Sequence, residues 1–198
     1  MAKNTINVGL IGDGMMGAVH AAALRRLGYI NVQALVSESR ETADIRKREL
    51  GIKNGYGDYK KLLEDNTIDA VHVLTPNNLH FKMVKDVLEA GKHVICEKPL
   101  ALNLEEGKEL LSLARKSRCC HAVCHNMRYY PMVKEARELK EKGEIGYIRF
   151  VNGAYLQDWL YKDSDYNWRV SAELGGRSRA VADIGTHVLD MVQHITGL

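Results

Sequence analysis

Three features that would point to a specialised class of protein are missing from this sequence: many cysteines, a strong excess of one charge and a long apolar run. Four cysteines among 198 residues are too few for a disulfide-dense mini-protein. The formal net charge is +3, and no segment concentrates it. This balance argues against nucleic acid or an anionic membrane as a partner. No apolar stretch approaches the length of a membrane span, so no membrane partner is expected.

The composition that remains is typical of a folded chain. Hydrophobic residues make up 45% and charged residues 27%, which excludes a disordered tail or a collagen-like fibre. The cysteines fall in apolar, strand-like segments, which favours reduced thiols and a cytoplasmic location. A strand-like pattern starts close to the first residue, so we expect no cleaved signal peptide.

Short apolar runs alternate with longer helical patterns up to about residue 125. Strands are expected over 6–11, 31–36, 68–74, 93–96 and 119–125, and helices over 15–27, 42–50, 59–64, 78–90 and 104–117. Strands alternating with helices are typical of βαβ units and a parallel sheet. We therefore predict an α/β fold, a doubly wound parallel (Rossmann) sheet over residues 1–125.

The rhythm changes after residue 125. We expect a helix over 131–142, a long alternating strand over 147–156, an irregular polar and aromatic stretch over 157–180, and a helix over 183–195. One strand and two helices do not make a self-sufficient domain. Residues 126–198 are therefore predicted to be the start of an incomplete α+β substrate and oligomerisation domain.

A glycine motif lies between the first predicted strand and helix. Gly12, Gly14 and Gly17 enclose Asp13, Met15 and Met16. In this context the glycines permit a tight turn, close approach of a pyrophosphate and close packing of helix on strand. We predict that Gly12, Gly14, Met15, Met16 and Gly17 bind a dinucleotide. The alternative is a turn that only connects two elements.

The end of the second strand bears on the choice of cofactor. A carboxylate at this position accepts hydrogen bonds from the adenosine ribose and repels a 2′-phosphate, and Glu38 is the candidate. Arg40 follows it, and an arginine can bind the extra phosphate of NADP. The sequence favours NAD, with NADP as the alternative.

Two further strand ends carry polar clusters. One comprises Thr75, Pro76, Asn77 and His80, and the other Glu97, Lys98 and Pro99. Ligands of open α/β sheets bind outside the carboxyl ends of strands, where a lysine can reach a substrate hydroxyl. We predict cofactor contacts at Thr75, Pro76, Asn77, His80, Glu97 and Lys98. Taken alone, Lys98 is better explained as a surface charge after a strand.

An aspartate and a histidine four residues apart open the last predicted helix. Asp183 and His187 share one helical face there, and an aspartate orients and activates a neighbouring imidazole. That arrangement suits a group that takes a proton from an alcohol. Taken alone, the motif is better explained as a buried histidine satisfied by a neighbouring aspartate. A metal site on the stripe formed by His187, Asp190 and His194 is the less favoured alternative, and no metal is predicted here or at the cysteines.

An aromatic stretch precedes that helix. Trp159, Tyr161, Tyr166 and Trp168 are interleaved with polar residues that include Arg169. Such a mixture suits a sugar ring, which has an apolar face and equatorial hydroxyls. A loop that tucks its rings into a domain interface is the alternative.

These motifs occur in an order that resembles the glucose–fructose oxidoreductase / inositol dehydrogenase (Gfo/Idh/MocA) family. The resemblance rests on the glycine motif, on Thr75–His80, on Glu97–Pro99, and on Asp183, Gly185 and His187. Asn126, Arg128, Tyr129 and Pro131 match the stretch that opens the family's second domain. The chain looks like the N-terminal portion of such a protein, whose second domain is built on a large open-faced sheet.

The resemblance implies NAD(P)-dependent hydride transfer with a sugar or cyclic polyol. Lys98 would polarise the hydroxyl, and His187 would act as acid/base with Asp183 as its partner. Substrate contacts are expected at Arg128, Tyr155, Trp168, Arg169, Asp183 and His187. The resemblance also implies a homo-oligomer formed through the C-terminal sheet. An NAD-dependent glycosidase that uses a transient keto-sugar, or a dinucleotide-binding fragment without turnover, are the alternatives.

Overall fold

The computed structural model describes residues 5–197, which form two compact units divided between Val123 and Cys124. The boundary predicted after residue 125 lies two residues further along the chain. Each unit is described by itself.

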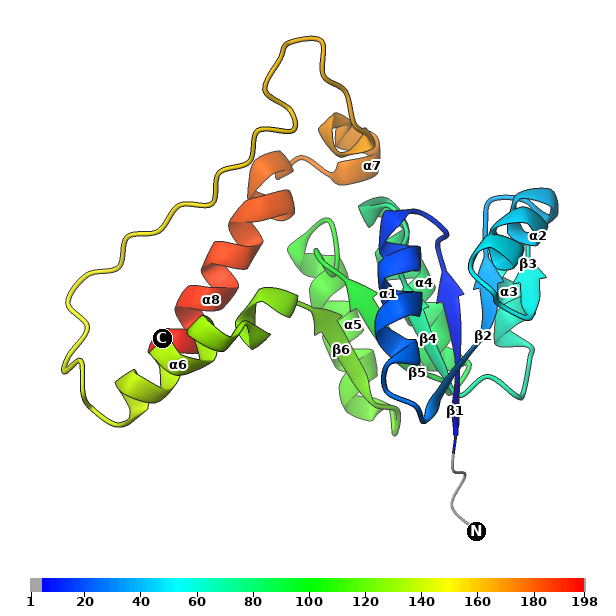
Figure 1. Cartoon of the computed structure of the whole chain (residues 1–198), viewed down its shortest axis with the longest axis horizontal. Coiled ribbons are helices and arrows are strands. Elements are labelled where there is room, and N and C mark those ends of the chain that lie inside the picture. Colours follow the sequence, from blue (N-terminus) through cyan, green and yellow to red (C-terminus); the bar gives the residue numbers. More distant parts are fainter. Residues whose placement is uncertain (1–4, 198) are drawn as a thin grey trace. The chain divides into compact units, whose positions relative to one another are not determined.

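The first unit contains a six-stranded sheet in the order β3-β2-β1-β4-β5-β6 (Figure 1). Its strands are β1 (Ile6–Ile11), β2 (Ile30–Val36), β3 (Asn54–Tyr56), β4 (Ala70–Val73), β5 (His93–Glu97) and β6 (His121–Cys124). β1 pairs in parallel with β2 and β4, β2 with β3, and β4 with β5. The predicted doubly wound sheet is confirmed. The strand order reverses beside β1, and ligands bind at that point in such sheets.

Helices cover both faces of this sheet (Figure 1). They are α1 (Met15–Arg25), α2 (Arg40–Glu49), α3 (Tyr59–Leu63), a 3₁₀ turn η1 (Asn77–Leu79), α4 (His80–Glu89) and α5 (Leu104–Lys116). Leu10 and Ile11 are both buried, yet they belong to two different apolar clusters because side chains alternate along a strand. Leu10 packs in the cluster that contains Ala21 of α1. Ile11 packs in the cluster that contains α4 and Leu110 of α5.

Side chains cap the starts of α3 and α5. The Asn103 side chain accepts a hydrogen bond from the Glu106 N–H at 2.9 Å, and the Asp58 side chain accepts one from the Lys60 N–H. Glu106 in turn accepts from the N–H of Leu102 rather than from that of Asn103. The start of α5 therefore carries a capping box in which the reciprocal bond is moved by one residue.

The second unit is mainly helical within residues 124–197. Its elements are η2 (Asn126–Tyr129), α6 (Pro131–Glu141), η3 (Trp168–Val170), α7 (Ala172–Gly175), the π-helical η4 (Val181–Gly185) and α8 (Thr186–Thr196). α6 packs against α8. The single helix predicted over 183–195 is wrong in its first turn, because a π-helical turn precedes α8.

The strand predicted over 147–156 is also wrong. Tyr147–Leu156 has no regular structure, and Tyr147, Phe150 and Leu156 are each more than four-fifths exposed. A strand exists only when a neighbour supplies ladder hydrogen bonds, and no segment of residues 124–197 does so. The alternating pattern therefore describes an apolar stretch that has no pairing partner in the described part of the chain.

None of the helices in the part of the chain that the structure describes has both the length and the apolar character needed to cross a membrane.

Candidate active site

Two of the three motif glycines are required by the fold. Gly12 has a φ of +113°, and a Cβ built on it would lie 2.7 Å from the Leu74 carbonyl oxygen. A Cβ on Gly17 would lie 2.5 Å from the Gly12 carbonyl oxygen. Both positions lack room for any side chain, because the clashing atoms belong to the backbone. They fix the tight turn between β1 and α1.

Gly14 differs, because it faces open space. A Cβ there would meet nothing within 4 Å. Gly14 is the N-cap residue of α1, no side chain caps this helix, and its first turn carries no acidic residue. Uncapped N–H groups and the positive end of the helix dipole form an environment that suits a pyrophosphate. The glycine loop therefore fits the dinucleotide that the sequence predicts, and Met15 at its edge is largely exposed.

Arg46 holds this loop in place, a role that the sequence analysis missed. Its Nη2 donates to the Asp13 carbonyl oxygen at 2.8 Å, and the Asp13 carboxylate accepts from the Ser37 hydroxyl at 2.9 Å. Arg46 lies on α2, 33 residues from Asp13. A contact this distant leaves no periodic signal in the sequence.

The residues that follow β2 are exposed, as a ribose site requires. Glu38 is exposed directly after the strand end. Ser39 caps α2 by accepting from the Thr42 N–H, and Arg40 Nε pairs with Asp44 at 2.9 Å. The Arg40–Asp44 pair is solvent-exposed, and such pairs contribute little stability. Glu38 is thus free of a competing structural role in the cap, while Arg40 already has a carboxylate partner.

His80 connects two of the polar strand ends. Its side chain is completely buried, with Nε2 at 2.9 Å from the Thr75 carbonyl oxygen and Nδ1 at 2.7 Å from the Pro99 carbonyl oxygen. Burial lowers the pKa of His80, and the two carbonyl acceptors partly oppose this shift. This geometry favours a structural role, in which His80 joins the loop of Asn77 to the loop of Lys98. Its direct contact with a cofactor stays a prediction.

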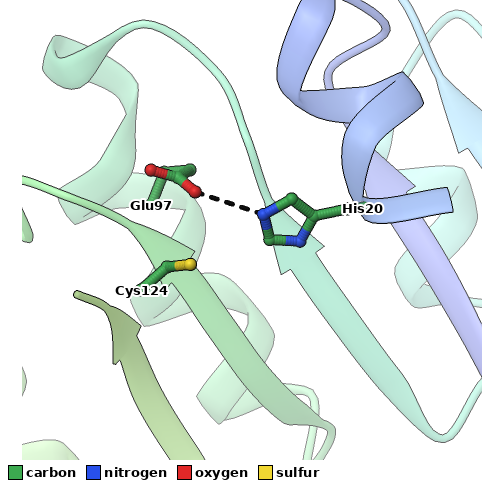
Figure 2. A group of neighbouring side chains, drawn as sticks. All are labelled: His20, Glu97 and Cys124. Carbon is green, nitrogen blue, oxygen red and sulfur yellow. Dashed lines mark hydrogen bonds and ion pairs between the residues drawn. The ribbon is translucent and has the colours of Figure 1, made fainter. Parts of the chain in front are cut away.

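The end of β5 carries a hydrogen-bonded chain that was also missed. Glu97 Oε1 lies 3.1 Å from His20 Nε2, and Glu97 Oε2 accepts from the Lys98 N–H at 3.3 Å. Figure 2 shows His20 of α1 directed at Glu97, with Cys124 at the end of β6. His20 Nδ1 in turn lies 2.8 Å from Nδ1 of His72, a residue of β4. Burial, followed by the charge of His20, lowers the pKa of His72 to about 4.

In the second unit, aromatic rings surround His187. Its imidazole is buried and packs edge-to-face with Tyr155 and His125, at centroid distances of 6.1 and 6.0 Å. Asp183 lies within 3.3 Å of Arg169 Nε as an ion pair. Asp183 as the partner of His187 stays a prediction.

Arg169 also lies against the faces of two tryptophans. Its guanidinium carbon is 4.5 Å from the Trp168 centroid and 5.7 Å from the Trp159 centroid. Cation–π contacts at such distances stabilise both partners. A pocket beside this group is lined by Gln157, Trp159, Leu160, Arg179, Ala180, Asp183 and Ile184. Part of the aromatic stretch therefore lies next to a hollow, as a sugar site requires.

The helical stripe weighed as a metal site makes other contacts. Asp190 accepts from Arg128 Nε at 3.0 Å and also pairs with its Nη2. The hydrogen bond with Asp190 raises the pKa of Arg128. His194 Nδ1 lies 3.1 Å from Arg137 Nη1. Two of the three stripe residues are thus engaged with arginines, and Arg128, predicted to contact substrate, fixes α8 to η2.

Comparison with known families covers both units. Residues 6–125 match the oxidoreductase family with an NAD-binding Rossmann fold, and residues 133–198 match the GFO/IDH/MocA C-terminal domain. The chain belongs to the GFO/IDH/MocA oxidoreductase family. The predicted NAD-binding Rossmann domain is thereby confirmed.

Several relatives of this chain are named as dehydrogenases of a sugar or an inositol. Levoglucosan dehydrogenase of Pseudarthrobacter phenanthrenivorans is 37% identical over 97% of this chain and 51% of its own length. Myo-inositol 2-dehydrogenase of Thermotoga maritima is 32% identical over 71% of this chain and 42% of its own. The solved complex of levoglucosan dehydrogenase with NADH superposes on 98% of this chain and 54% of its own, with a TM-score of 0.94 and 36% identity. The chain spans about half the length of these relatives.

Proposed function

We propose that the protein is an NAD-dependent dehydrogenase that transfers a hydride between the nicotinamide and a hydroxyl of a sugar or cyclic polyol. One observation carries the proposal. The uncapped start of α1 follows β1, the Asn77 turn follows β4, and Lys98 follows β5, so all three lie along the carboxyl edge of one parallel sheet. That edge binds ligands in open α/β folds.

The chain's own residues supply binding and proton transfer. NAD held at the glycine loop would supply the hydride acceptor for the carbon that carries the reacting hydroxyl. Lys98 donates a hydrogen bond to that hydroxyl oxygen and polarises it. His187 takes the hydroxyl proton as general base and returns it in the reverse direction. Asp183 orients the imidazole of His187 in this proposal.

The substrate class follows from the named relatives and from the residues of the second unit. Solved structures of levoglucosan dehydrogenase contain levoglucosan or L-sorbose together with NADH. Tyr155, Trp168 and Arg169 offer the aromatic faces and hydrogen-bond donors that a pyranose needs. A panel of levoglucosan, L-sorbose and inositols, assayed for NAD reduction, tests the proposal. NADH binding without turnover of any polyol would favour a binding protein instead.

Gly14 provides a clean test of the cofactor site. Gly14→Val places a side chain in open space at the start of α1, so the fold should survive while the pyrophosphate is excluded. We expect NADH affinity to fall at least about tenfold, which corresponds to about 1.4 kcal/mol. Fluorescence titration measures it. Gly107→Ala on α5, where a Cβ also meets nothing within 4 Å, is the matched control and should bind normally.

Glu38 is proposed to set the preference for NAD. Glu38→Ala removes a charged acceptor of ribose hydroxyl hydrogen bonds, so the ratio of NADH to NADPH affinity should fall by about tenfold. Titration with both cofactors measures this ratio. An unchanged ratio would assign the preference to another residue. A Bacillus subtilis relative, 27% identical, is named as an NADP(+)-dependent scyllo-inositol dehydrogenase, so the family does not share one preference.

We further propose that the protein is cytoplasmic and self-associates. Within the described residues no disulfide joins Cys96, Cys119, Cys120 or Cys124, as expected in a reducing compartment. The exposed apolar segment that contains Tyr147, Phe150 and Leu156 favours association with a further copy. Light scattering should show a species larger than the monomer, and Phe150→Ser should reduce its amount. A monomer at all concentrations would contradict this proposal.

A further inference from the structure

Three side chains from three elements of the first unit form one hydrogen-bonded chain. His72 projects from β4, His20 from α1 and Glu97 from the end of β5. The nitrogen–nitrogen distance between the two imidazoles is 2.8 Å, and the nitrogen–oxygen distance from His20 to Glu97 is 3.1 Å. All three side chains are largely buried, with 11% of His20 and 12% of Glu97 exposed. Polar groups buried this deeply either form complete networks or destabilise the fold.

The direction of each hydrogen bond in this series of side chains follows from Glu97, its last member. The Glu97 carboxylate only accepts hydrogen bonds, so His20 Nε2 carries a proton and donates it to Oε1. In a neutral His20, Nδ1 is then the acceptor, and His72 must donate from its own Nδ1. The low pKa of His72 keeps this ring neutral at physiological pH. One tautomer of each histidine therefore satisfies the whole chain.

The surroundings of His72 contain little else that can pair with it. Its register neighbours on the sheet are Leu10 of β1 and Ile95 of β5, which are both apolar. α1 contributes His20, and β5 contributes Glu97 with the cation of Lys98 following it in sequence. Leu10 and Ile95 are the neighbours of His72 on the two adjacent strands. Among the described residues, His20 supplies the polar side chain that contacts Nδ1 of His72.

The chain ends on the backbone of the proposed active-site lysine. Glu97 Oε2 accepts from the Lys98 N–H while Oε1 accepts from His20. The same helix that carries His20 presents its N-terminus at the glycine loop. The Glu97 carboxylate thus connects α1, which begins at the glycine loop, to the backbone N–H of Lys98.

We propose that His20 and His72 are positioning residues, which hold the Glu97 carboxylate and through it the backbone at Lys98. His72 fixes the orientation of the His20 ring, and His20 fixes the carboxylate. Neither histidine needs to touch substrate or cofactor. The inference rests on the proposed function only where it gives Lys98 a role in the reaction.

Two substitutions of His20 separate its two hydrogen bonds. His20→Gln places an amide nitrogen near the position of Nε2, so the bond to Glu97 is kept and the bond to His72 is lost. His20→Asn places an amide oxygen near the position of Nδ1, so the bond to His72 is kept and the bond to Glu97 is lost. Both replacements are polar and smaller than or similar in size to imidazole, so they form a matched pair.

Amide hydrogen exchange of Lys98 in the 198-residue chain is the first readout. We expect exchange to accelerate at least about fivefold in His20→Asn and Glu97→Ala, and by only about twofold in His20→Gln, which keeps the bond to Glu97 but loses the support of His72. The amide of Val87, on the other face of the sheet, reports on global stability and should not change. Wild-type exchange at Lys98 in His20→Asn would overturn the proposal. So would equal acceleration in the two His20 variants with Val87 unchanged.

The histidine tautomers provide a second readout that needs neither cofactor nor turnover. Long-range ¹H–¹⁵N spectra above the ordinary titration range of histidine should show a proton on Nδ1 of His72 and on Nε2 of His20. The His72 tautomer should persist in His20→Asn and be lost in His20→Gln. Wild-type spectra in which neither Nδ1 carries a proton would contradict the hydrogen-bonded chain, because no N–H would then lie between the two rings.

Kinetics of the active enzyme then distinguish a positioning role from a purely structural one. We expect His20→Asn to lower kcat about tenfold with little change in KM for NAD, and His20→Gln to restore most of the loss. Unchanged kcat in His20→Asn, despite faster Lys98 exchange, would overturn the positioning role. A wild-type protein without turnover would contradict the proposed function but not the hydrogen-bonded chain. Hydrogen exchange at Lys98 and the histidine tautomers test that chain without any turnover.

Discussion

Replacing Lys98 by methionine in the active enzyme is expected to lower turnover by about a hundredfold to ten-thousandfold. Methionine keeps the length and apolar stem of lysine but removes the hydrogen bond that polarises the substrate hydroxyl. Cofactor affinity should stay nearly unchanged, because the proposed pyrophosphate site lies at the glycine loop and not at Lys98. Steady-state kinetics together with NADH titration measure both quantities.

The same loss is expected for His187→Asn, since asparagine cannot take up the hydroxyl proton. His187 is buried against the rings of Tyr155 and His125, so a small polar replacement also changes its packing. A folded variant with weak turnover and a flattened pH profile would support the acid/base role.

Matched controls separate these effects from general damage. Lys85→Met removes a lysine that pairs with Glu109 on the surface, and His121→Asn changes an exposed histidine of β6. Both variants should retain normal turnover. Near-normal turnover in Lys98→Met or His187→Asn would remove that residue from the proposed mechanism.

The first unit is expected to lose stability when the pH falls below neutrality, because of His72. Burial lowers the pKa of His72 from 6.5 to about 4 in the folded state. The unfolded chain therefore binds a proton more readily than the folded one between these values. The contribution of neutral His72 to the free energy of unfolding is fully present above about pH 6.5. It falls progressively, by about 3 kcal/mol in total, as the pH drops toward 4.

Urea unfolding at several pH values measures this loss. His72→Asn keeps an amide group near Nδ1 but does not titrate, so its free energy of unfolding should vary less with pH than that of the wild type. Contributions from other groups, such as His80, occur in both proteins and cancel in the difference. Equal pH dependence in the wild type and His72→Asn would show that His72 does not carry the effect, and His121→Asn should behave like the wild type.

Much of the first unit could be predicted because its signals are local. Gly12, Gly14 and Gly17 follow an apolar strand, and Asn103 precedes a helical pattern at capping distance from Glu106. These residues act on neighbours in sequence. The strand β3 (Asn54–Tyr56) was missed because three residues around a glycine show no period.

The rest depends on contacts between distant residues. Arg46 with Asp13, and His20 with His72, are joined across 33 and 52 residues, and neither pair follows a spacing rule. In Tyr147–Leu156 the local pattern predicts a strand, but the distant contacts that a strand needs are not present in the described residues. Alternation tells which side chains would share a face, but it does not supply the neighbouring strand on which a ladder depends.

The contacts of Asp13 have a consequence for how the protein can change its cofactor. Arg46 and Ser37 hold the glycine loop through Asp13, whereas Glu38 and Arg40 stand outside that network. The groups that shape the proposed phosphate site are therefore different residues from those proposed to contact the ribose. A loop already fixed before binding loses little conformational entropy when the dinucleotide arrives. Substitutions at positions 38 and 40, which leave the Ser39 cap of α2 intact, can then change the dinucleotide preference during evolution with little loss of stability.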